Sequence, residues 1–216
     1  MAYDTIRLMP QSLGRVLKRN EEALLAGVEA PRSTGGNLSA AEDVERRMAI
    51  VVKMVQDHQP FREIARELGE LLRVYADHAD PARAGAQDPR MQLVSSEYAR
   101  FVEAHVSEVP LVYDRRVPSI LEGAAISDSL AALELEASRS AVRIADAFLR
   151  EGRVLPAASF DYRSVPFAEA SLAYSRAITA ASQAWLRAWS SANGDLKGAP
   201  FARLPPSASG KRTGKK

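Results

Sequence analysis

Arg73, Asp77 and Arg83 are the residues whose types and spacing most suggest chemistry in this chain. The carboxylate of Asp77 can bind a metal ion or pair with a cation. The two arginines are always charged and have no lone pair to offer a metal. Their presence favours ion pairing, and it leaves Asp77 as the one candidate metal ligand of the three.

These residues belong to an amphipathic segment that we expect to be helical from Pro60 to about residues 77–79. Its apolar side is formed by Phe61, Ile64, Leu68, Leu71, Leu72 and Tyr75. Its polar side is formed by Arg66, Glu70, Arg73 and Asp77. Arg73 and Asp77 stand four residues apart and can pair on an exposed surface. Alternatively, the pair lies inside the protein, where Gly69 allows a neighbouring helix to approach closely.

Helical periodicity extends along nearly the whole chain and predicts an all-α bundle of five to seven helices in residues 1–196. The other predicted helices cover 11–28, a segment starting at Ser39 in a capping box, 92–109, 127–150 and 166–194, with a short turn at 119–125. Breakers at 31–37, 82–89, 110–118 and 152–164 separate them. Gly194 is expected to end the last helix as a C-cap. We find no alternating strand pattern and no internal repeat.

The segment Leu68 to Arg83 resembles the central metal-binding segment of the zinc-dependent phospholipase C and S1/P1 nuclease superfamily. That family reads Leu-Gly-x-Leu-x-His, then Asp, Pro and His at fixed steps. Leu68, Gly69, Asp77 and Pro81 match the pattern, whereas Arg73 and Arg83 stand at the two histidine positions. Further similar stretches begin at Arg7, Gln59 and Ala173, so residues 5–200 could align.

The resemblance implies a phospholipase C/P1 nuclease-like helical bundle with a degenerate zinc site. Three hypotheses follow. The chain has lost its zinc site and serves as a binding or scaffold protein, with no cofactor expected. Alternatively, it is a zinc-dependent phosphodiesterase whose missing ligands lie in an incomplete amino terminus. Finally, it is an unrelated helical interaction module.

For the other residues that could bind metals or ligands, a structural role is the favoured interpretation. The three histidines are expected to cap a helix end (His58) or to lie on the surface (His78, His105). Glu97 and Glu103 are distant candidate ligands. Tyr75, Trp185 and Trp189 are pocket candidates, although core packing is the favoured interpretation for the two tryptophans.

Charge and composition limit the classes of protein to which this chain can belong. Residues 197–216 carry six basic and no acidic side chains, which leaves residues 1–196 with a net charge of −4 out of the whole-chain +2. We therefore predict a flexible, disordered basic tail with weak affinity for anions. No apolar run reaches the ~20 residues of a membrane-spanning helix. The absence of cysteine excludes disulfides. As written, the chain reads as cytoplasmic, or as exported if a signal peptide precedes it.

Overall fold

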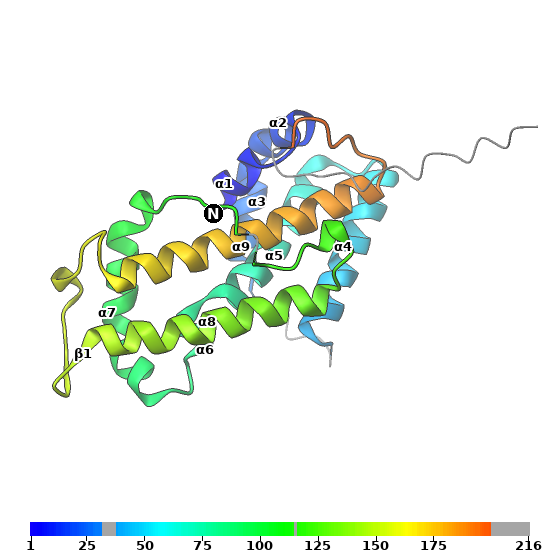
Figure 1. Ribbon diagram of the computed structural model, residues 1–216. Coiled ribbons are helices and arrows are strands. Elements are labelled where there is room, and N and C mark those ends of the chain that lie inside the picture. Colours follow the sequence, from blue (N-terminus) through cyan, green and yellow to red (C-terminus); the bar gives the residue numbers. More distant parts are fainter. Residues whose placement is uncertain (32–37, 115, 200–216) are drawn as a thin grey trace, which may run out of the picture.

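Nine α-helices account for most of the described residues (1–31, 38–114 and 116–199) in the computed structural model (Figure 1). They are α1 (Ala2–Arg7), α2 (Gln11–Arg19), α3 (Glu21–Glu29), α4 (Ala40–Gln56), α5 (Phe61–Ala79), α6 (Pro81–Ala84), α7 (Pro89–His105), α8 (Ile126–Phe148) and α9 (Val165–Ser191). Short 3-10 turns lie at Val106–Glu108, Ile120–Glu122 and Ala157–Ser159. The all-α fold class is thus confirmed, with nine helices in the described residues where five to seven were predicted, because the chain also forms the short α1 and α6 and divides the segment 11–28.

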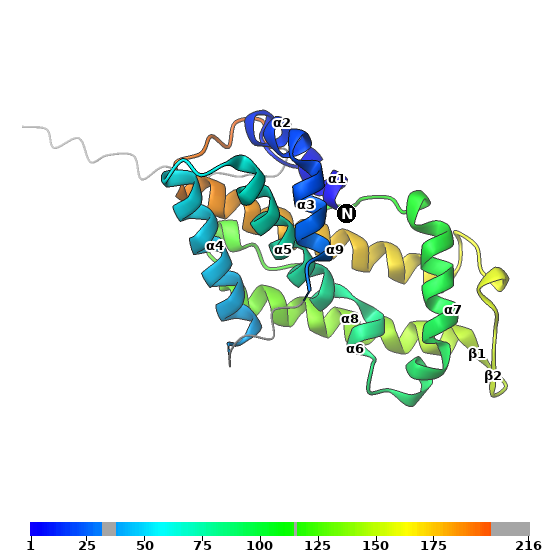
Figure 2. The ribbon, with the colours of Figure 1, turned by 180° about the vertical axis from the view of Figure 1, so that it is seen from behind.

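Two long antiparallel helices, α8 and α9, run side by side through the molecule, as Figures 1 and 2 show from opposite sides. Helix α7 packs against them near one end, and α4 packs against them near the other. Helix α5 contacts α3, α4, α8 and α9. These contacts make α5, α8 and α9 the scaffold on which the remaining helices are arranged.

The buried apolar side chains form two clusters that share α8 and α9. The larger cluster includes Leu71, Leu133 and Trp185, and the smaller one is centred on Phe101 and Phe148. Both Phe148 and Trp185 are completely buried. Each cluster packs against a different part of the same two helices, so one pair of helices supports both cores.

Local capping signals place several helix starts where the sequence predicts them. Ser39 accepts a hydrogen bond from the Glu42 amide, and the Glu42 carboxylate accepts one from the Ser39 amide, which confirms the predicted capping box. Helix α5 begins directly after Pro60, as expected. The predicted turn at 119–125 is present as the 3-10 turn Ile120–Glu122.

Other helix bounds differ from the prediction. The predicted helix 11–28 is divided at Asn20, whose side-chain amide donates to the Val16 carbonyl at 2.9 Å and caps the end of α2. The predicted loop 82–89 contains α6. Asp80 and Asp88 each cap the helix that follows, with proline in its first turn. This paired Asp-Pro signal was present in the sequence and explains why α7 starts three residues early.

The segment predicted as a loop at 152–164 begins within a two-stranded hairpin, β1 (Leu149–Arg150) and β2 (Arg153–Val154). Its turn residues, Glu151 and Gly152, have φ angles of 52° and 75°. Two positive φ angles are what a tight hairpin turn requires. Because each strand has only two residues, the hairpin is too short to produce a detectable alternation of apolar and polar residues.

Helix α9 ends at Ser191, and its end differs in detail from the predicted glycine cap. Asn193, with φ 63°, takes the left-handed conformation, while the Gly194 amide donates to the Trp189 carbonyl at 2.8 Å. A Cβ on Gly194 would lie 2.3 Å from the Trp189 indole ring. Gly194 is therefore required for close packing, whereas Asn193 reverses the chain.

Two predictions concern residues outside the described ranges. These are the breaker cluster at 31–37, of which residues 32–37 are not described, and the basic tail at 197–216, of which residues 200–216 are not described. Residues 197–199 of the predicted tail are described, and Ala199 packs against the larger apolar cluster. Among the described residues, no helix combines the length and the apolarity needed to cross a bilayer.

Candidate functional site

Helix α5, which carries Asp77, crosses α3 closely. A Cβ on Gly69 would lie 2.1 Å from the Leu24 carbonyl oxygen and 3.0 Å from the Gly27 Cα. A Cβ on Gly27 would lie 2.0 Å from the Arg66 carbonyl oxygen. The two glycines therefore bring the backbones of the helices into contact. This arrangement confirms the predicted close approach of a neighbouring helix at Gly69.

Asp77 is part of an ion pair at the junction of α5 and α6. Its Oδ2 atom lies 2.6 Å from Nη1 of Arg83, and the two side chains are 25% and 45% exposed. Arg73, one turn earlier on α5, is half-buried, and its Nε atom is buried without a hydrogen-bond partner. The structure therefore brings Asp77 and Arg83 together, and the Arg73–Asp77 pair stays a prediction.

The predicted polar side of α5 faces α4 through a buried arginine. Arg47 is 4% exposed and hydrogen-bonds to Asp43 of its own helix and to Glu67 and Glu70 of α5. The sequence analysis did not single out Arg47, although it stands among the apolar positions of α4. Arg66 lies 4.0 Å from Glu70 and is largely exposed. Of the predicted polar side, Glu70 therefore packs against α4, while Arg66 stays largely exposed.

The three histidines do not converge. His58 has a φ of 55° and follows the end of α4, which agrees with its predicted place at a helix end. His78 and His105 are half-buried, contrary to the surface positions expected. His78 Nδ1 lies 2.6 Å from the Glu134 carboxylate, and His105 stacks on Phe101 with ring centroids 4.4 Å apart. The His78 contact joins residues 56 positions apart and gives no local signal, whereas His105 stands four residues after Phe101 on the same helix, a spacing that could have placed it beside that ring.

The three aromatic pocket candidates have different environments. Tyr75 and Trp185 are completely buried in the larger cluster, and the Trp185 Nε1 atom donates to the Leu68 carbonyl at 3.0 Å. Core packing, the favoured interpretation, is confirmed for Trp185, and Tyr75 also packs in the core of the described residues. Trp189 packs beside Phe61 at 6.3 Å and lines a cavity of about 510 Å³ near His58.

Metal ligands are not assembled in the described part of the chain, where no three His, Asp or Glu side chains meet in a geometry suited to an ion. The carboxylate of Asp77 is engaged by Arg83. Glu97 accepts a hydrogen bond from the Ala157 amide at 2.8 Å and pairs with Arg100. The residues at the positions predicted for a substituted metal site therefore do not fit a zinc ion, which requires several nitrogen or oxygen donors.

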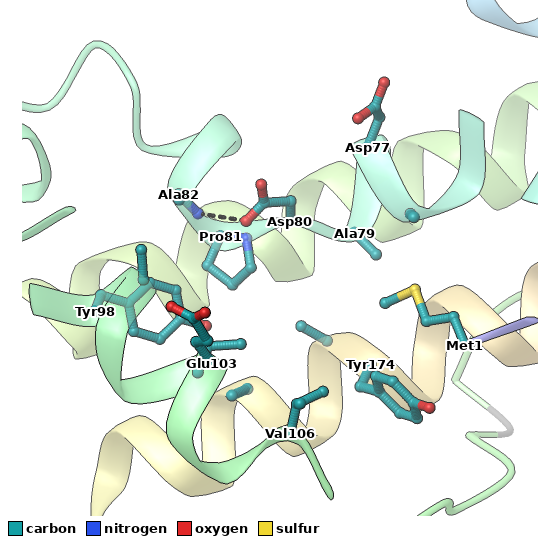
Figure 3. A pocket seen from close by; sticks show the side chains of 15 residues that line it. Met1, Asp77, Ala79, Asp80, Pro81, Ala82, Tyr98, Glu103, Val106 and Tyr174 are labelled. Carbon is teal, nitrogen blue, oxygen red and sulfur yellow. Dashed lines mark hydrogen bonds between the residues drawn. The ribbon is translucent and has the colours of Figure 1, made fainter. Parts of the chain in front are cut away.

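A groove of about 560 Å³ lies beside Asp77, between the α5–α6 junction, α7 and the first half of α9 (Figure 3). Most of its surface is apolar. It is lined by Met1, Ala76, Asp77, Ala79, Asp80, Pro81, Ala82, Tyr98, Ala99, Val102, Glu103, Val106, Ala170, Ala173 and Tyr174. Its volume falls within the roughly 300–1,000 Å³ typical of small-molecule sites. Of the residues singled out in the sequence, the groove includes Asp77 and Glu103.

One wall of the groove is fixed by a hydrogen bond between distant parts of the chain. The Tyr174 hydroxyl on α9 donates to Asp4 of α1 at 2.6 Å. Burial and the neighbouring Asp4 carboxylate both raise the pKa of Tyr174, so the phenol stays protonated and keeps this bond at neutral pH. The apolar periodicity alone gave no indication of this contact, because the two residues are 170 positions apart.

The interior face of α9 carries charged residues that the sequence analysis missed. Arg176 is 2% exposed and hydrogen-bonds to Asp114 at 3.0 Å and Glu136 at 2.8 Å. Glu169, 6% exposed, bonds to Arg143 and Ser140. Burial by itself raises the pKa of Glu169, but Arg143 and Ser140 outweigh it and hold that pKa below its ordinary value of 4.5. These pairs join α8, α9 and the connector, by which we mean the segment between α7 and α8 that contains Asp114.

Comparisons with models of protein families, with curated proteins and with solved structures find no match to this chain.

Proposed function

We propose that this protein is a non-catalytic, small-molecule-binding domain on a phospholipase C/P1 nuclease-like helical bundle. Arginines occupy the histidine positions of that family's metal-binding segment. The observation that carries the proposal is the 2.6 Å ion pair between Arg83 and Asp77, the one carboxylate kept at a family position. The guanidinium compensates the Asp77 charge, a task that a zinc ion performs in the resembling family.

The adjacent groove supports a binding role. It is built by α7 and α9 and by the α5–α6 junction, and its walls are mainly alanine, valine and tyrosine side chains. A concave, mostly apolar site with a few polar groups is typical of small-molecule binding. Hydrolysis by a zinc-bound water needs a donor set that Arg73 and Arg83 do not supply.

Zinc quantification coupled to a phosphodiesterase assay tests the loss of the metal site. We expect purified protein to hold far less than one zinc ion per chain and to leave bis(p-nitrophenyl) phosphate unhydrolysed. Asp77→Ala should change neither measurement. Near-stoichiometric zinc that is lost in this variant, together with turnover abolished by chelators, would contradict the proposal and restore the zinc-dependent phosphodiesterase.

Binding of the neutral probe 1-octanol, followed by nuclear magnetic resonance titration, tests the groove. Ala99 lines the groove on α7, and it is exposed enough to accept a larger side chain. We expect Ala99→Trp to abolish binding by filling the space. Ala104→Trp, at an exposed position of the same helix outside the groove, is the matched control. Loss of binding in both variants, or in neither, would contradict the assignment of the site.

A further inference from the structure

The walls of the groove carry negative charge without a matching positive side chain. Among the residues that line it, Asp77, Asp80 and Glu103 are acidic, and there is no lysine, arginine or histidine. Asp77 is neutralised by Arg83 from outside this set, and its carboxylate points away from the groove in Figure 3. The amino group of Met1 has Asp4 as its charged neighbour. Asp80 and Glu103 therefore remain to act on a ligand.

Asp80 and Glu103 have few partners of their own. Asp80 accepts a hydrogen bond from the Ala82 amide at 2.9 Å, and the backbone amide and the charge of Arg83 also stabilise its ionised form. Partial desolvation raises the pKa of Asp80, although the residue as a whole remains exposed. Glu103 is exposed and forms no hydrogen bond or ion pair within the described ranges. A cation placed at this end of the groove would stabilise both carboxylates.

A largely buried tyrosine with an accessible, unpaired hydroxyl adds an independent indication of a ligand. Tyr98 of α7 lines the groove and is only 5% exposed, yet its hydroxyl has no hydrogen-bond partner in the described part of the chain. Its ring extends toward the groove next to Glu103 in Figure 3. The hydroxyl oxygen itself is not fully enclosed by protein, so a ligand in the groove can reach it. A ligand atom at this point would provide the missing partner.

We infer that the groove binds an apolar organic molecule bearing a protonated amine, with the ammonium group held by Asp80, Glu103 and the Tyr98 hydroxyl. The ammonium donates to the two carboxylates and to the phenolic oxygen. The apolar body packs against side chains such as Val102, Ala173 and Tyr174. This inference rests on the proposed function, because it names the ligand class of the same groove.

Three probes with the same chain length separate charge from apolar burial: n-octylamine, 1-octanol and octanoate. At pH 7 we expect octylamine to bind about tenfold more tightly than octanol. Octanoate should bind more weakly than octanol, because the carboxylates repel it. Glu103→Gln combined with Asp80→Asn should lower octylamine affinity at least fivefold, roughly what removing two ion pairs gives, and leave octanol unchanged. Glu108→Gln, exposed and outside the groove, is the matched control.

The outcomes distinguish the two proposals. Octylamine binding that falls in the double variant and disappears in Ala99→Trp supports the inference. Equal binding of octylamine and octanol, with both lost in Ala99→Trp, overturns the amine specificity and leaves the groove as a site. Absence of binding by every probe overturns both. Thermal melting of each variant shows whether lost binding reflects lost folding.

Discussion

Single atoms decide how closely α3 and α5 pack. Gly27 and Gly69 lie where α3 crosses α5, and neither position has space for a Cβ. The sequence showed that Gly69 would permit a close approach. Its partner Gly27 was not predicted. A glycine in a helix shows that a close approach is possible, but it does not show which residue lies opposite.

Gly69→Ala should destabilise the protein strongly. The new methyl group would overlap the Leu24 carbonyl at 2.1 Å, so α3 must move away from α5. We expect a loss of about 3 kcal/mol in the free energy of unfolding, measured by urea denaturation.

Gly14→Ala is the matched control for that experiment. Its added Cβ would meet the Ile6 carbonyl oxygen at 3.3 Å, a contact that a small shift can relieve. We expect a change within about 1 kcal/mol, because alanine also favours the helix. Equal losses in both variants would contradict a special role for the α3–α5 crossing.

At the scale of elements, buried ion pairs attach the connector to α8 and α9. Arg176 has side-chain exposure of 3% and bridges Asp114 and Glu136. Arg176→Met should leave these carboxylates without their buried partner. We expect a loss of about 3–5 kcal/mol in the free energy of unfolding.

Arg139→Met is the comparison for this bridge, because Arg139 pairs with the same Glu136 while its side chain is 56% exposed. We expect this loss to stay within about 1 kcal/mol. A comparable loss in the two arginine variants would show that burial does not set the strength of the network.

The buried carboxylate of Glu169, on α9, makes the stability of the fold depend on pH. Because the pKa of Glu169 is lower in the folded than in the unfolded protein, its ionised form stabilises the fold at neutral pH. That contribution is lost as the pH falls below about 4.5, through the folded-state pKa. The difference in unfolding free energy between the wild type and Glu169→Gln should therefore be largest near pH 7 and shrink toward pH 3.

Urea denaturation at several pH values checks this dependence, with Glu108→Gln as an exposed control that should differ little from the wild type throughout. A Glu169→Gln difference that stays constant with pH would show that the Arg143–Glu169 pair does not contribute in this way.

The helices also show which structural features could be predicted from the sequence and which could not. Apolar periodicity and local caps such as Ser39 and Pro60 predicted the long helices, since both signals act within a few residues. The break at Asn20 and the Arg176 network were missed. A mid-helix asparagine has no distinctive spacing, and a buried arginine resembles an exposed one until its partner helices are known. Asp77 was identified as a site residue, whereas its groove depends on three distant segments.

For the whole molecule, α8 and α9 couple the two apolar clusters into one cooperative unit. Phe148 lies in the smaller cluster and Trp185 in the larger, on these two neighbouring helices. We expect denaturation followed by tryptophan fluorescence, which reports the larger cluster, to coincide with the loss of helical circular dichroism.

Phe148→Ala should lower both transitions together, by about 3–5 kcal/mol, because it leaves a cavity in the smaller cluster. Val142→Ala, at an exposed position of the same helix, should change them little. A fluorescence transition that keeps its midpoint in Phe148→Ala would show that the clusters unfold separately.

The chain leaves α9 at the far end from the groove, where Gly194 packs against Trp189. Between Tyr174 and Ser191 the helix axis advances roughly 25 Å at 1.5 Å per residue. A dye or surface tether attached after Ala199 would therefore leave the ligand entrance unobstructed. Immobilisation through this terminus should preserve binding, so sensor formats can compare amphiphilic amines directly.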